Sequence, residues 1–103
     1  MEKGNSMNKK IYDTLKDYEI SELEIKDILN LSPMMDVITY EEFIENCYVL
    51  VRNGYPQSDL DVLIMSNPKL FVGSPKDLEE DLIKLKKEYG DIEEILKDNP
   101  NII

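Results

Sequence analysis

The fold is decided by "SNPKLFVGSP", residues 66–75, which separates two segments with helical apolar periodicity. Pro68 lacks a backbone N–H and pushes Asn67 out of the helical region, so a helix must end here. The "SP" that follows "KLFV" is typical of the N-cap and first position of a new helix. We therefore predict a 3₁₀ turn at this break, with Leu70 and Phe71 in the groove between consecutive helices.

The same break recurs, because Ser32-Pro33 and Asn99-Pro100 also follow apolar helical segments. An offset of 35 residues places Ile25 on Leu60, Ile28 on Leu63, Leu29 on Ile64, Pro33 on Pro68 and Phe43 on Leu78. An offset of 32 places residues 60–70 on residues 92–102. Such units bury their apolar faces only by stacking. The sequence thus predicts two and a half stacked helix-turn-helix repeats of roughly 32 to 35 residues, a small α-solenoid.

Local start and stop signals predict an all-α domain of about five or six short helices. The expected helices cover residues 8–18, 21–32, 39–53, 56–67 and 74–90, with a further helical segment beginning at residue 91. Ser21 with Glu24, and Thr39 with Glu42, have the spacing of capping boxes. Residues 1–7 are predicted to be a disordered N-terminal segment, and residues 8–103 a single helical-repeat domain.

Composition favours a small acidic protein with a modest core. The 103 residues are 42% apolar, which suffices for one domain of this size. Asp and Glu number 22 against 12 Lys and Arg, and the formal net charge is -10. This charge attracts basic surfaces and repels the phosphates of nucleic acid, so nucleic acid is not the expected partner.

The chain has no apolar run of the ~20 residues that a membrane-spanning helix needs, and "MEKGNSMNKK" lacks the apolar stretch of a secretory signal. We expect a cytoplasmic protein without a membrane partner. Lys, Ile and Asn are frequent relative to Arg and Ala, which is typical of an AT-rich genome. This composition favours a low-GC bacterium or one of its mobile elements as the source.

The sequence resembles the repeat of the mitochondrial transcription termination factor family over residues 53–103, "NGYPQSDLDVLIMSNPKLFVGSPKDLEEDLIKLKKEYGDIEEILKDNPNII". The shared features are a short helix, the Asn-Pro-x-Leu break, a helix of pattern "SP..L...L..L" and a following Gly. Residues 15–52 resemble it more weakly. The resemblance implies a superhelix of helix, helix and 3₁₀ units, and in that family a basic concave face binds duplex nucleic acid. This chain departs from the family there, with one arginine and fewer than three units, so we carry over the fold and no binding residue.

No catalytic, metal or cofactor site is expected. The chain has no histidine and one cysteine, so the usual pairing of a nucleophile with an imidazole cannot be built. Cys47 lies on the apolar stripe of its expected helix and is interpreted as a packed core thiol. The carboxylates at residues 41–45 and 79–81 lack the spacing of a calcium loop and are interpreted as solvated helix surface. The Lys cluster at residues 84–87 is either a phosphate site or partly paired, Lys84 with Glu80.

The favoured function is a protein-interaction or regulatory module without catalysis, whose partner carries a basic surface. The alternative is a nucleic-acid-related protein, either a binder like the termination factors or an acidic mimic of DNA. The candidate partner-binding residues are Tyr55, Tyr89, Ile102 and Ile103. The two isoleucines end an incomplete unit, so we expect them either to fold back as a cap or to be covered by another chain, including a second copy.

Overall fold

The computed structural model describes residues 7–103, and the regular elements of this part of the chain are all helices, without a strand. Its α-helices are α1 (Lys9–Asp17), α2 (Glu22–Leu31), α3 (Tyr40–Arg52), α4 (Leu60–Ser66), α5 (Pro75–Tyr89) and α6 (Ile92–Asp98). Within the same residues, the short 3₁₀ helices are η1 (Pro33–Asp36), η2 (Gln57–Asp59) and η3 (Pro68–Phe71). The prediction of an all-α protein of five or six short helices is confirmed.

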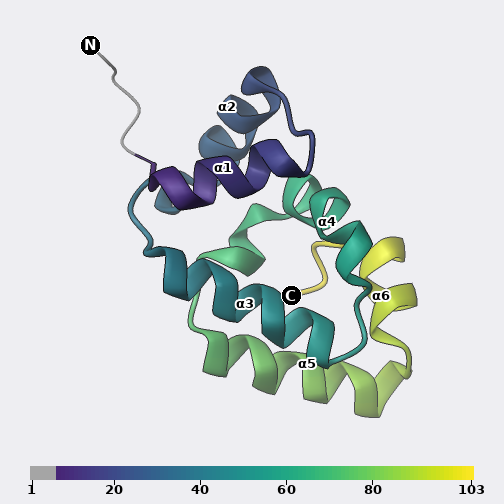
Figure 1. Cartoon of the computed structure of the whole chain (residues 1–103). Helices are drawn as coiled ribbons and strands as arrows, with labels where there is room; N and C mark the ends of the chain where they lie inside the picture. Colours follow the sequence, from purple (N-terminus) through teal and green to yellow (C-terminus); the bar gives the residue numbers. More distant parts are fainter. Residues whose placement is uncertain (1–6) are drawn as a thin grey trace.

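The break after Asn67 lies in the middle of the packed helices. α3 and α5 run side by side (Figure 1) and share the most extensive contact between two elements of the described chain. η3 packs against α3, α4 and η1, while α1 packs on α3, α2 on α4 and α6 on α5. Leu70 and Phe71 of η3 are buried, and the ring of Phe71 lies 5.9 Å from that of Phe43 in α3. The predicted 3₁₀ turn, with these two residues inserted between helices, is confirmed.

Helix starts follow the capping signals in the sequence. Ser21 and Glu24 form a complete capping box at α2, and Thr39 and Glu42 form another at α3. In each box the hydroxyl accepts a bond from the backbone N–H of the Glu, and the Glu carboxylate accepts one from the N–H of the cap residue. Ser74 caps α5 as predicted, and Pro75 occupies its first position. These local bonds satisfy N–H groups that would otherwise lack partners.

The proline breaks repeat in backbone geometry as well as in sequence. The residue before each proline has nearly the same angles, φ -143° and ψ 86° at Ser32, φ -150° and ψ 78° at Asn67, and φ -145° and ψ 85° at Asn99. The carbonyls of these residues accept bonds from the N–H groups of Met35, Leu70 and Ile102 at 3.0, 3.2 and 3.2 Å. The internal repeat is therefore present in the local structure, and its superhelical stacking stays a prediction.

A second repeated feature is a residue of positive φ that follows each of α1, α3 and α5. Glu19, Gly54 and Gly90 have φ of 64°, 115° and 103°, at intervals close to the sequence repeat. The following residues close matching turns, because the N–H of Ile20 bonds to the carbonyl of Leu15 and that of Tyr55 to Leu50, at 3.1 and 2.9 Å. Helix α1 is thus the counterpart of α3 and α5, and α2 is the counterpart of α4 and α6.

Two buried positions differ from the sequence expectation. Residues 1–6 of the predicted disordered segment lie outside the described residues, but Met7 is only 7% exposed and belongs to the core, so residue 7 is part of the folded domain. Asn46 in α3 is fully buried, and its amide nitrogen donates to the carbonyl of Gly73 at 3.0 Å. The apolar pattern of α3 gave no indication of this bond, because it crosses to a segment far along the chain.

Glu19 offers a test of the repeated left-handed turn. Replacing Glu19 with Gly removes the steric cost of a side chain at positive φ, roughly 1–2 kcal/mol, against an entropic cost of roughly 0.5–1 kcal/mol for Gly in the unfolded chain. We expect the free energy of unfolding of Glu19→Gly, measured in urea, to rise by about 0.5 kcal/mol. Gly54→Ala is the matched opposite change and should lower it. A rise with Gly54→Ala would contradict this account.

Candidate functional site

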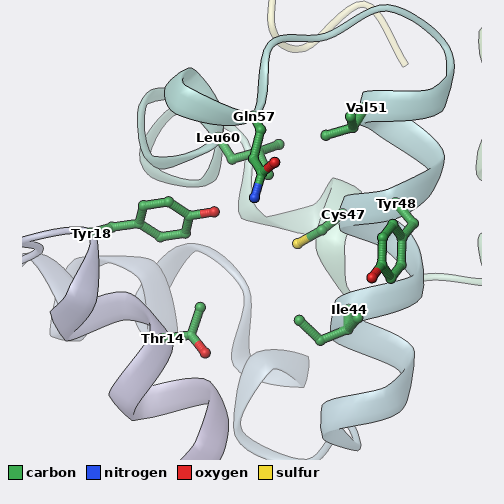
Figure 2. Close-up of a pocket in the computed structure, with 8 residues that line it drawn as sticks. All are labelled: Thr14, Tyr18, Ile44, Cys47, Tyr48, Val51, Gln57 and Leu60. Atoms are coloured by element: carbon green, nitrogen blue, oxygen red, sulfur yellow. The ribbon is translucent and has the colours of Figure 1, made fainter.

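A pocket of about 160 Å³ opens where α1, α3 and the start of α4 meet. Figure 2 shows its lining residues, which are Thr14, Tyr18, Ile44, Cys47, Tyr48, Val51, Gln57 and Leu60. Four of them come from α3 at positions i, i+3, i+4 and i+7, the spacing that places side chains on one helix face. This is the broad apolar stripe that the sequence pattern indicates for α3, and the pocket lies along one edge of it.

Polar groups gather on one side of this pocket. In Figure 2 the hydroxyl of Tyr18 and the amide of Gln57 point toward the same space, opposite the sulfur of Cys47. Thr14 lies one helical turn before Tyr18, and its hydroxyl donates to the carbonyl of Lys10 at 2.8 Å, so in Figure 2 its methyl group is the part directed toward the pocket. Hydroxyl and amide groups both donate and accept hydrogen bonds, whereas the rest of the lining is mostly apolar. The pocket therefore presents an apolar surface with neutral hydrogen-bonding groups.

None of the lining residues carries a charge at neutral pH. Burial raises the pKa of the Cys47 thiol to about 12, so the sulfur stays protonated. Burial is also the main cause of the raised pKa of Tyr18, with smaller contributions from Cys47 and Asp61. A protonated thiol is a poor nucleophile, and no lining residue is poised to exchange a proton near neutral pH. This arrangement can bind an uncharged group, and it holds no group activated for covalent chemistry.

The internal repeat explains why space remains beside Cys47. The position that Cys47 occupies in α3 corresponds at the 35-residue offset to Leu82 in α5, which is fully buried. Cys47 packs against the core, as its interpretation as a core thiol predicts, but it is only partly buried and lies at the edge of the core. Its side chain is shorter than leucine and leaves part of the corresponding volume unfilled. The difference between Cys47 and Leu82 was visible in the sequence, but the contributions of Thr14, Tyr18 and Gln57 depend on packing.

The four candidate partner-binding residues lie in different surroundings. Tyr89 is 60% exposed at the end of α5, and Ile102 is 36% exposed. Ile103 is half-buried and packs against the core. Tyr55 is only 2% exposed, so the expectation that it is available to a partner is wrong. Its ring packs inward because the turn after Gly54 directs it back to the core.

The C-terminal residues fold back onto the preceding unit. The side-chain amide of Asn67 is buried and donates to the carbonyl of Pro100 at 2.7 Å. Lys97 in α6 binds Asp59 at 2.7 Å and Glu93 at 2.8 Å, which joins the end of the chain to η2. Of the two isoleucines, Ile103 packs against the core, as a cap would, whereas Ile102 is exposed, so coverage of Ile102 by another chain stays a prediction.

Charged side chains are paired in part. Arg52, the one arginine of the chain, binds Glu79 through two bonds, and the hydrogen bond from Arg52 is the main cause of the lowered pKa of Glu79. The predicted pairing of Lys84 with Glu80 is absent from the described residues, and Lys84 is exposed. Across residues 7–103, no group of three or more Cys, Asp or Glu side chains is arranged to hold a metal ion.

No family model matches this chain, and neither the curated proteins nor the solved structures include a match. The resemblance to the termination factor repeat therefore stays a prediction. Among the helices of residues 7–103, none has both the length and the apolar character needed to cross a membrane.

The state of Cys47 can be tested by alkylation. Iodoacetamide reacts with the thiolate, so at about pH 8.5 we expect folded protein to react much more slowly than urea-unfolded protein. The folded rate should continue to rise toward pH 12, because burial raises the pKa of this thiol to about 12. Mass spectrometry after timed quenching measures both rates. Equal rates in the folded and unfolded chains at the lower pH would show that the thiol is not protected.

Proposed function

We propose that this protein is a non-catalytic protein-interaction module whose pocket beside Cys47 receives one uncharged side chain of a partner. The observation that carries the proposal is the neutral, largely apolar pocket of about 160 Å³ between α1, α3 and α4. Contact energy in protein interfaces is concentrated in a few side chains that fill such pockets. The repeat places the pocket on a framework of packed helices, so it is available without rearrangement.

The size of the pocket favours a side chain over a larger ligand. Pockets for drug-sized molecules and cofactors usually enclose roughly 300–1,000 Å³. A cavity of roughly 150 Å³, by contrast, holds one benzene molecule. The pocket beside Cys47 thus has room for about one aromatic ring. The hydroxyl of Tyr18 and the amide of Gln57 give a partner tyrosine two groups to bond with its own hydroxyl.

The negative charge of this protein favours a partner segment in which basic residues flank the side chain that enters the pocket. The chain has a formal net charge of -10, which speeds the approach of basic segments. Asp61, which is partly exposed, lies close enough to the pocket to contribute to the raised pKa of Tyr18. A segment with a tyrosine or phenylalanine between Lys or Arg residues combines both requirements. Nucleic acid is the weaker candidate, because the net charge of -10 repels its phosphates.

Cys47→Leu tests the proposal while retaining a residue that the fold itself uses. Leu82 occupies the corresponding position of α5, so the variant should fold, but its larger side chain fills the pocket. A displayed peptide library should be selected on the parent protein, and the enriched peptides then measured by fluorescence anisotropy. We expect enriched peptides to share one aromatic residue with basic neighbours, and to bind Cys47→Leu on the order of tenfold more weakly.

Ile83→Asp is the matched control, because it changes an exposed apolar residue of α5 outside the pocket to the residue that α1 has at the corresponding position. It should bind the peptides as the parent does. Equal binding by Cys47→Leu and the parent would remove the pocket from the interaction. In the same buffer, duplex DNA should show no retarded band in a gel-shift assay, and a clear band would favour the nucleic-acid alternative.

A further inference from the structure

A second surface stands out because large apolar side chains are exposed on α2 and η1. Leu23, Leu31 and Met34 are 73%, 60% and 56% exposed, and we call these three residues the α2–η1 surface. Leu23 and Leu31 are eight residues apart in α2, so they lie on one face of the helix with Asp27 between them. Large contiguous apolar patches on a protein surface commonly mark binding sites, and these three exposed residues of one short segment are candidates for such a site.

The internal repeat supplies a comparison for this surface within the same chain. At the 35-residue offset, Leu23, Leu31 and Met34 correspond to Ser58, Ser66 and Lys69, which are also exposed. Leu31 and Ser66 are each the last residue of their helix, and Met34 and Lys69 are each the second residue of a 3₁₀ helix. The fold therefore accepts polar residues at these positions. The apolar residues of the first unit are not required by its local geometry.

We propose that the α2–η1 surface binds a basic amphipathic helix of another protein. Of the three acidic residues of α2, Glu22 lies 3.7 Å from Lys16 and Glu24 completes the capping box. The negative charge available to a partner is therefore centred on Asp27. Asp27 is exposed between the two leucines, where it can bind a lysine or arginine at the edge of the partner's apolar stripe. A second copy of the chain carries the same net charge of -10 and is repelled.

This surface is separate from the pocket beside Cys47. None of the residues that line the pocket belongs to α2 or η1. The two proposals can therefore be tested independently. We expect Cys47→Leu to leave binding at the α2–η1 surface unchanged.

The repeat provides a variant that is expected to fold. Leu23→Ser, Leu31→Ser and Met34→Lys together give the first unit the residues that the second unit has at the same exposed positions. The probe is a labelled synthetic helix of about five turns, with leucines on one face and lysines on the other. By fluorescence anisotropy we expect the triple variant to bind this probe at least about tenfold more weakly than the parent.

Val62→Asp is the matched control, since Val62 is 54% exposed on α4 and corresponds to Asp27 in the first unit. It should bind the probe as the parent does, and a peptide of the same composition with its leucines scattered around the helix should bind neither protein. The proposal is overturned if the parent does not bind the probe, or if the triple variant binds it equally well. It is also overturned if light scattering finds a parent dimer that the triple variant loses, because the surface then binds a second copy.

Discussion

The restriction that proline places on the residue before it determines most of this structure. At Asn67 the chain cannot stay helical, so α4 ends and the next residues turn through η3. The turn brings Phe71 against Phe43 of α3, which links two units through their cores. The side-chain amide of Asn67 also donates a hydrogen bond to the carbonyl of Pro100. Asn67 therefore lies at the end of α4 and also fixes the position of the next proline break, at Asn99-Pro100.

Because the break recurs, each residue of one unit can be compared with the residue at the corresponding position of another unit. Equivalent residues with similar burial report the needs of the fold, as do Leu15 and Leu50, both fully buried. Positions where the two units differ in the size or polarity of the side chain are not explained by the needs of the fold, and they are candidates for a role in function. Cys47 is smaller than Leu82, the buried residue at the corresponding position of the next unit, and a pocket lies beside Cys47. The exposed apolar residues of α2 differ from their polar counterparts on the outside of the molecule, and the result is an open surface.

Local features of this fold were predictable from the sequence, and features that depend on distant packing were not. The capping box of Thr39 and Glu42 involves residues of one helical turn, so its signal is complete in the sequence. Tyr55 lies in a predicted turn and was expected to be exposed, but the turn at Gly54 directs its side chain into the core. The left-handed conformation of Glu19 could not be predicted from the sequence, because the residue that usually adopts this conformation after a helix is glycine. The pocket likewise needs α1, α3 and α4 to be assembled before its lining can be identified.

The near-identical backbone angles before the three prolines have a consequence for how such a chain changes in length. Each break is set by residues within a few positions of its own proline, so it does not depend on how many units precede or follow it. Duplicating or deleting one unit keeps the remaining turns intact, provided that the new neighbours cover each other's apolar faces. We therefore expect the insertion or deletion of a whole unit to disturb this chain less than that of part of a unit, because a whole unit carries its own proline break.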